Sequence, residues 1–147
     1  DIVLLEEEKR RYKMSYFEVN SKKIVEDLMN LGCVPNKTLI KKFPTYNEVP
    51  KELMGAFMRG YADGNGSVNK YDKNWLVSTG SEDFAKGFLN ELNVQISEKI
   101  TSIYKIRNAN CWTFKLGSGK TAVKVFDLMY NEKTTVYLER KYLKFIK

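Results

Sequence analysis

The stretch MGAFMRGYADGNGSV, residues 54–68, decides how this chain folds. Pro50 lies just before it, and proline is favoured in the first turn of a helix, so the sequence predicts a helix that begins near Pro50 and ends near Gly64. Ala56, Gly60 and Gly64 follow one another at intervals of four residues and therefore share one helical face. Small residues on one face let a second backbone approach closely, so we expect a helix–helix interface there.

Two β-hairpins are expected after this helix, because alternating sequences flank short polar turns. Their strands cover residues 67–71 and 75–79, then 100–107 and 111–116. The inward face of the second hairpin is expected to carry Ile100, Tyr104, Ile106, Trp112, Phe114 and Leu116. The outward faces of the two hairpins are expected to carry Asn69, Lys73, Lys105, Arg107, Thr113 and Lys115.

Three more helices complete this part of the chain. One begins after Ser81, an N-cap residue followed by two acids, and the others cover residues 120–130 and 138–146. Their expected buried residues are Phe84, Phe88, Leu89 and Leu92, then Ala122, Val123, Phe126 and either Leu128 or Met129, whereas Lys141, Lys144 and Lys147 are expected to be solvated. Over residues 50–131 the order is helix, hairpin, helix, hairpin, helix. This order predicts an α+β fold with an antiparallel sheet and helices on one face, leaving a basic face uncovered.

The first 49 residues have a separate pattern of strand, strand and helix. Residues 3–20 read as two strands, and Ser21 is a good N-cap for a helix over 22–31. Gly32 stands where a glycine ends a helix, and residues 33–49 are expected to form an irregular connection.

The composition favours an anionic partner. The chain has 147 residues, the size of one domain, with a formal net charge of +7 and 43% hydrophobic residues. A folded basic domain most often binds nucleic acid, although a basic surface also serves solubility alone. The absence of histidine excludes imidazole catalysis and Cys/His zinc sites. Cys33 and Cys111 lie far apart and form no disulfide framework, so we expect an intracellular, reducing compartment and not secretion.

The segment GYADGNG, residues 60–66, followed by Ser67 and Val68, resembles the signature helix of the LAGLIDADG homing endonucleases. The family pattern is glycine, two apolar residues, aspartate, a small residue, an acid and glycine. Arg59, residues 32–37 and the ending at 137–142 are also similar, the last to intron- and phage-borne members. The resemblance covers nearly the whole chain. It implies an αββαββα unit that binds double-stranded DNA on its sheet, with metal-dependent cleavage of the phosphodiester as the family activity.

The same resemblance locates the expected chemistry at the end of the signature helix. It implies that Gly64 and Asn65 lie at a Mg²⁺ site, with a basic residue from Lys115 or Lys120 assisting near the cleaved bond. The family has a carboxylate where this chain has Asn65, and a neutral amide binds Mg²⁺ more weakly. Natural degeneration, an engineered inactive variant and a site that works with an amide all explain Asn65. Asp63, the earlier acid of the motif, is expected to serve the helix end.

The resemblance also implies how the chain is organised. Residues 50–147 match one unit with a C-terminal helix, and residues 1–49 match the rear half of a preceding unit or an N-terminal extension. Members with two motifs pair the two signature helices within one chain, whereas members with one motif form homodimers. We therefore expect a homodimer or a partner half that carries a second motif helix. The alternatives to a nuclease are a non-catalytic module, namely an RNA maturase or a DNA-binding repressor, and an interaction domain.

Overall fold

The computed structural model describes residues 2–7, 14–35, 38–71, 74–130 and 136–146. It separates into two compact units, Asp1–Pro35 and Asn36–Lys147, where the length alone predicted one domain. The connection expected at residues 33–49 is therefore mostly part of the second unit. Within that unit, the Phe43 ring packs 5.6 Å from the rings of Phe57 and Phe84.

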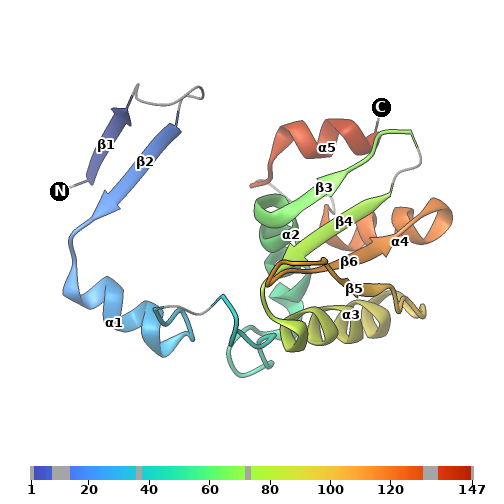
Figure 1. Ribbon diagram of the computed structural model, residues 1–147, viewed down its shortest axis with the longest axis horizontal. Coiled ribbons are helices and arrows are strands. Elements are labelled where there is room, and N and C mark those ends of the chain that lie inside the picture. Colours follow the sequence, from blue (N-terminus) through green and yellow to red (C-terminus); the bar gives the residue numbers. More distant parts are fainter. Residues whose placement is uncertain (1, 8–13, 36–37, 72–73, 131–135, 147) are drawn as a thin grey trace. The chain divides into compact units, whose positions relative to one another are not determined.

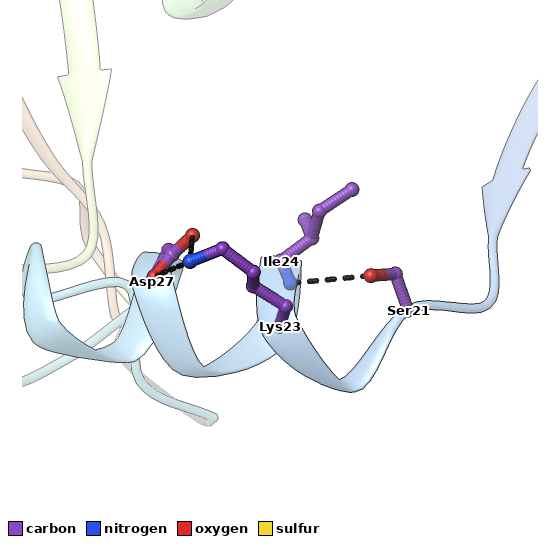
Figure 2. A network of polar contacts seen from close by, with 4 residues as sticks. All are labelled: Ser21, Lys23, Ile24 and Asp27. Atoms are coloured by element: carbon purple, nitrogen blue, oxygen red, sulfur yellow. Dashed lines mark hydrogen bonds and ion pairs between the residues drawn. The ribbon is translucent and has the colours of Figure 1, made fainter.

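The first unit confirms the predicted pattern of strand, strand and helix. Strand β1 (Ile2–Glu7) pairs antiparallel with β2 (Met14–Val19), with Ile2 opposite Val19. Helix α1 (Lys22–Asn30) follows directly. It begins as the sequence predicts, because the Ser21 hydroxyl accepts a hydrogen bond from the Ile24 amide at 3.3 Å (Figure 2). One turn along, Lys23 and Asp27 form an exposed ion pair at 3.1 Å.

The end of α1 has the predicted glycine stop. Gly32 has φ 79°, a left-handed conformation that favours glycine. Its amide donates to the Met29 carbonyl at 3.0 Å, and the Cys33 amide donates to the Leu28 carbonyl at 2.8 Å. These two bonds are the Schellman motif, which satisfies carbonyls that the helix end leaves without partners.

The second unit is a mixed α+β fold around one antiparallel sheet, as predicted (Figure 1). The sheet order is β3-β4-β6-β5. A short 3₁₀ turn, η1 (Lys51–Leu53), leads into α2 (Met54–Asn65). The remaining elements are β3 (Gly66–Val68), β4 (Trp75–Thr79), α3 (Glu82–Ile96), β5 (Ile103–Lys105), β6 (Trp112–Gly117), α4 (Gly119–Met129) and α5 (Glu139–Ile146).

The helices and one face of the sheet share the core. The largest fully buried side chains include Trp75, Phe84, Phe88, Phe114, Met58 and Val125. The predicted face of α3 is confirmed, since Phe84, Phe88, Leu89 and Leu92 are all buried. The predicted face of α4 is wrong at one position: Val125 is buried, whereas Val123 is half exposed. A helical stripe that includes Ala122 and Met129 reaches Val125 at the next turn and leaves Val123 on the flank.

Two predicted strands are shorter than expected, and one shows its other face to the core. The strand expected over 67–71 ends at Val68, and the strand expected over 100–107 covers only Ile103–Lys105. Ile103 lies opposite Phe114, which is buried, so Tyr104 points to the opposite face. The prediction that Tyr104 is inward and Lys105 outward is therefore wrong. A shift of one residue in a strand exchanges its two faces.

Candidate nucleic-acid interface

One face of the four-stranded sheet carries a set of polar side chains, which we call the open face. The buried strand residues Val68, Val77 and Phe114 point to the helices, so their neighbours along each strand point away from them. In the described part of the chain no helix buries a residue against this second face. The pairing register gives the open face Ser67 on β3, Leu76 and Ser78 on β4, Thr113 and Lys115 on β6 and Tyr104 on β5.

The open face is organised by cross-strand pairs. Ser78 and Thr113 are directly opposite, and their hydroxyl oxygens are 3.2 Å apart, which explains why Thr113 is buried on an otherwise accessible surface. Ser67, Leu76 and Lys115 form a row across three strands. Because neighbouring strands are about 4.8 Å apart, Lys115 lies roughly 10 Å from Ser67 along this row. Hydroxyl, phenol and ammonium groups are those that contact DNA phosphates and base edges.

The pairing register assigns none of the other described DNA-binding candidates to this face. Lys105 is on the core side of the sheet, at the end of β5, with its ammonium 5.9 Å from the centre of the Trp112 ring. Arg107 lies in the exposed turn after β5. Asn69 follows β3, and its side-chain oxygen accepts from the Tyr71 amide at 2.9 Å. Lys73 lies outside the described residues.

Asp63 has a structural role at the end of α2, as expected. Its carboxylate is buried, with an exposed fraction of 8% for the residue. One oxygen accepts from the Tyr130 hydroxyl at 2.6 Å, and the other accepts from the Leu138 amide at 3.0 Å. Leu138 immediately precedes α5, where the first amides of a helix have no partner within the helix. Asp63 therefore caps α5, and its charge also favours the positive end of that helix.

Lys141 of α5 in turn caps the C-terminal end of α2. Its ammonium donates to the Ala62 carbonyl at 2.9 Å and to the Asp63 carbonyl, at the negative end of α2. The expectation that Lys141 is solvated is wrong, since its exposed fraction is 4%. The signal was its position four residues before Phe145, which is also buried, because residues at that spacing share a helical face. The two helices thus cap each other.

The buried contacts shift the pKa values of two side chains, Tyr130 and Lys141. Burial raises the pKa of Tyr130 well above its ordinary value of 10, and the hydrogen bond to Asp63 and the charge of Asp63 act in the same direction. Burial lowers the pKa of Lys141, as does the nearby positive charge of Arg140. Arg59 joins the same region from α2, donating to the carbonyls of Met129 at 2.8 Å and Val136 at 3.0 Å.

The expected metal site at Gly64 and Asn65 has few suitable donors. Both residues are exposed at the end of α2, and both of the Asp63 carboxylate oxygens already accept hydrogen bonds. Mg²⁺ in proteins is usually bound through one or two carboxylates. Among the described residues no group of three or more His, Cys, Asp or Glu side chains is placed to hold a metal ion. The donors that the described residues place around Asn65 therefore do not fit Mg²⁺.

The register separates the two residues expected to share the catalytic work. Asn65 precedes Gly66, which lies opposite Val77, toward the Thr79 end of β4. Lys120 is the second residue of α4 and follows the end of β6, which lies beside Trp75 at the other end of β4. Lys115, the other basic candidate, lies in the row that begins two residues after Asn65. The register therefore favours Lys115 over Lys120 as the candidate closer to the end of α2.

The face of small residues on α2 is accessible. A Cβ atom placed on Gly60 or Gly64 meets no atom within 4 Å, and Ala56 is exposed. The close helix contact of α2 within this unit uses Gly55 instead, where a Cβ atom comes 2.8 Å from the Leu128 carbonyl oxygen of α4. Gly66 is needed at the switch from α2 to β3, because a Cβ there comes 2.4 Å from the Ala62 carbonyl oxygen.

Comparison with known proteins assigns this chain to no family. Among the described residues, no helix is both long and apolar enough to cross a membrane. No protein-family model matches the chain, and neither a curated protein nor a solved structure matches it.

Proposed function

We propose that the second unit binds double-stranded DNA on the open face of its sheet, as a LAGLIDADG-type unit. The observation that carries the proposal is a four-stranded antiparallel sheet with buried side chains on one face and Ser67, Ser78, Tyr104 and Lys115 on the other. A twisted antiparallel surface of this kind fits the DNA major groove, as β-ribbons do. The net charge of +7 favours a polyanion.

The order of elements supports the family assignment within this proposal. From α2 to α4 the unit runs helix, two strands, helix, two strands, helix, which is the order implied by the resemblance. The two ββα segments also share a pattern that the signature helix does not contain. FEVNS at residues 17–21 matches FKLGS at 114–118, and VEDLM at 25–29 matches VFDLM at 125–129. Each segment places a strand before the serine and a helix after it. This repetition favours the interpretation of the first unit as the rear half of a second, similar unit.

Cleavage is not supported by the donors of this chain alone. The carboxylate of Asp63 is used by Tyr130 and Leu138, and Asn65 offers a neutral amide. We therefore propose DNA binding as the activity of the chain by itself. Metal-dependent cutting is proposed only for an assembly with a second motif helix and a carboxylate at position 65.

The binding proposal is tested with Lys115→Gln on the open face and Lys86→Gln as a charge-matched control. Lys86 lies on α3, on the helix side of the sheet, in an exposed ion pair of small energetic value. Removing one phosphate contact makes the slope of log K against log salt shallower by about 0.9. Lys115→Gln is expected to show this change in duplex titrations, and Lys86→Gln is not. Equal slopes for both variants and the parent chain would remove the open face from the interface.

The cleavage question has its own test. Asn65→Asp restores a carboxylate at an exposed helix end without disturbing the packed core. Supercoiled DNA is incubated with the parent chain and with this variant, with and without Mg²⁺, at a protein concentration at which sedimentation shows that the chain is paired. Nicking by the Asp form alone supports a nuclease ancestry for the site, whereas efficient cutting by the parent form shows that Asn65 is not the inactivating residue. Parallel titrations with RNA of matched length test the maturase alternative.

A further inference from the structure

A basic groove lies between the residues that follow β3 and helix α5. The two elements that flank it, β3 and α5, are labelled in Figure 1. Its volume is about 440 Å³, and its lining is Lys70, Tyr71, Arg140, Leu143 and Lys144. Three of these five residues are cationic and none is acidic. The Lys70 ammonium lies 5.0 Å from the centre of the Tyr71 ring, which is 85% exposed.

The positive charges of this groove are brought together by the fold and not by the local sequence. Lys70 belongs to the connection after an edge strand, and Arg140 and Lys144 come four residues apart on one face of α5. Helix α5 is itself oriented by Asp63 and Lys141, so the groove wall is fixed to the end of α2. In the described part of the chain, Lys70 and Arg140 have no ion pair with a carboxylate.

Like charges such as those of Lys70 and Arg140 repel one another, and solvent and salt screen this repulsion in part. Burial lowers the pKa of neighbouring Lys141, and the positive charge of Arg140 lowers it further. An anion that carries several charges along its length relieves this repulsion at each cation. The groove is not enclosed, and its lining has a single aromatic ring, so it suits an extended polyanion better than an enclosed small molecule.

We propose that this groove is a second contact with nucleic acid, which binds consecutive phosphates of the DNA backbone through Lys70 and Arg140. The inference rests on the proposed function of the open face and extends it to the edge of the sheet beside β3. Because phosphate contacts carry no sequence information, this site adds affinity and fixes orientation, whereas base reading belongs to the open face. An acidic protein surface is the competing occupant, and it makes a different prediction for duplex binding.

The test uses the complete chain and the double variant Lys70→Gln/Arg140→Gln. The matched control is Lys86→Gln/Lys124→Gln, which removes two charges from exposed positions on α3 and α4. Duplex affinity is measured over a range of salt concentrations. The groove variant is expected to make the slope of log K against log salt shallower by about 1.8, since each neutralised phosphate contributes about 0.9. The control is expected to retain the parent slope. The conservative variant Lys70→Arg/Arg140→Lys keeps both charges and is expected to retain the slope as well.

The outcomes distinguish the two proposals. If the parent chain binds duplex and the groove variant has the parent slope, the groove proposal is overturned while DNA binding by the open face stands; an acidic protein partner predicts this result. If the parent chain binds no duplex at any salt concentration, the proposed function fails, and the groove proposal fails with it. Thermal melting of every variant verifies folding, and the exposed positions of Lys70 and Arg140 predict melting within a few degrees of the parent chain.

Discussion

The replacement Asp63→Asn tests whether the first acid of the signature motif holds the fold together. The carboxylate accepts from the Tyr130 hydroxyl at 2.6 Å and from the Leu138 amide at 3.0 Å, and the residue is buried. An asparagine of the same shape has one oxygen, so its NH₂ group must face one of the two donors. One charge-assisted hydrogen bond is lost, which costs about 1.5–3 kcal/mol. Losing the negative charge at the start of α5 adds about 0.3–1 kcal/mol.

The expected loss is therefore about 2–4 kcal/mol in the free energy of unfolding of the second unit. Both tryptophans of the chain, Trp75 and Trp112, belong to that unit, so their fluorescence during urea unfolding reports on it alone. With a urea dependence of about 2 kcal/mol per molar, the midpoint falls by roughly 1–2 M. The measurement is made in EDTA, because a stability loss without metal ions assigns the effect to the hydrogen bonds and not to a lost metal.

The controls for this prediction are built from the same region. Asp127→Asn removes an exposed carboxylate from α4 and is expected to change stability by no more than about 0.5 kcal/mol. Tyr130→Phe keeps the ring that stacks on Phe126 and Trp75 and removes only the hydroxyl. The cycle of Asp63→Asn and Tyr130→Phe is expected to give a coupling energy of about 1–2 kcal/mol. An Asp63→Asn midpoint in EDTA equal to that of Asp127→Asn would refute the reasoning.

Three other predictions follow from the same end of α2. Lys141→Met leaves the carbonyls at the end of α2 without their charged donor, so urea unfolding is expected to show a loss of about 1–3 kcal/mol. The folded state raises the pKa of Tyr130, so the stability that the neutral phenol contributes is full below pH 10 and is lost as the pH rises above it. The free energy of unfolding, measured at increasing pH, should decline more steeply for the parent chain than for Tyr130→Phe. Gly60→Leu should not lower the melting temperature, because a Cβ there meets no atom of the described residues within 4 Å, and it should prevent pairing with a partner helix in sedimentation. Gly55→Ala should lower the melting temperature, because its Cβ collides with the Leu128 carbonyl oxygen.

Sequence reasoning succeeded where the signal is local. The Ser21 and Ser81 caps, the Gly32 stop and the antiparallel pairing of successive strands all depend on residues close in the chain. A cap needs one side chain and an amide three residues away, so the sequence alone specifies the interaction. The α+β class follows from the order of these local elements.

Sequence reasoning failed where the surroundings of a side chain depend on residues far away along the chain. The face of β5 is set by its register with β6, and the alternation of Ile100, Tyr104 and Ile106 pointed the wrong way because the strand begins at Ile103. The burial of Lys141 depends on the end of α2, 78 residues away along the chain. A basic residue on a polar helix gives no local sign that its ammonium will meet two carbonyls. Tyr104 on the open face was missed for the same reason as the β5 register.

Asp63 and Asn65, near the end of α2, are restricted by the fold to different degrees. Asp63 is buried and bonded to two segments of the chain, so any replacement there is opposed by the fold itself. Asn65 is exposed two residues later, and in the described part of the chain its side-chain amide has no hydrogen-bond partner. The stability of the unit therefore places little restriction on position 65, where a carboxylate at the negative end of α2 costs only about 0.3–1 kcal/mol more than an amide. It follows that a change of chemistry at position 65 is expected to leave the sheet, its open face and the groove beside α5 unaltered, so the proposed binding and the proposed cleavage can be tested separately.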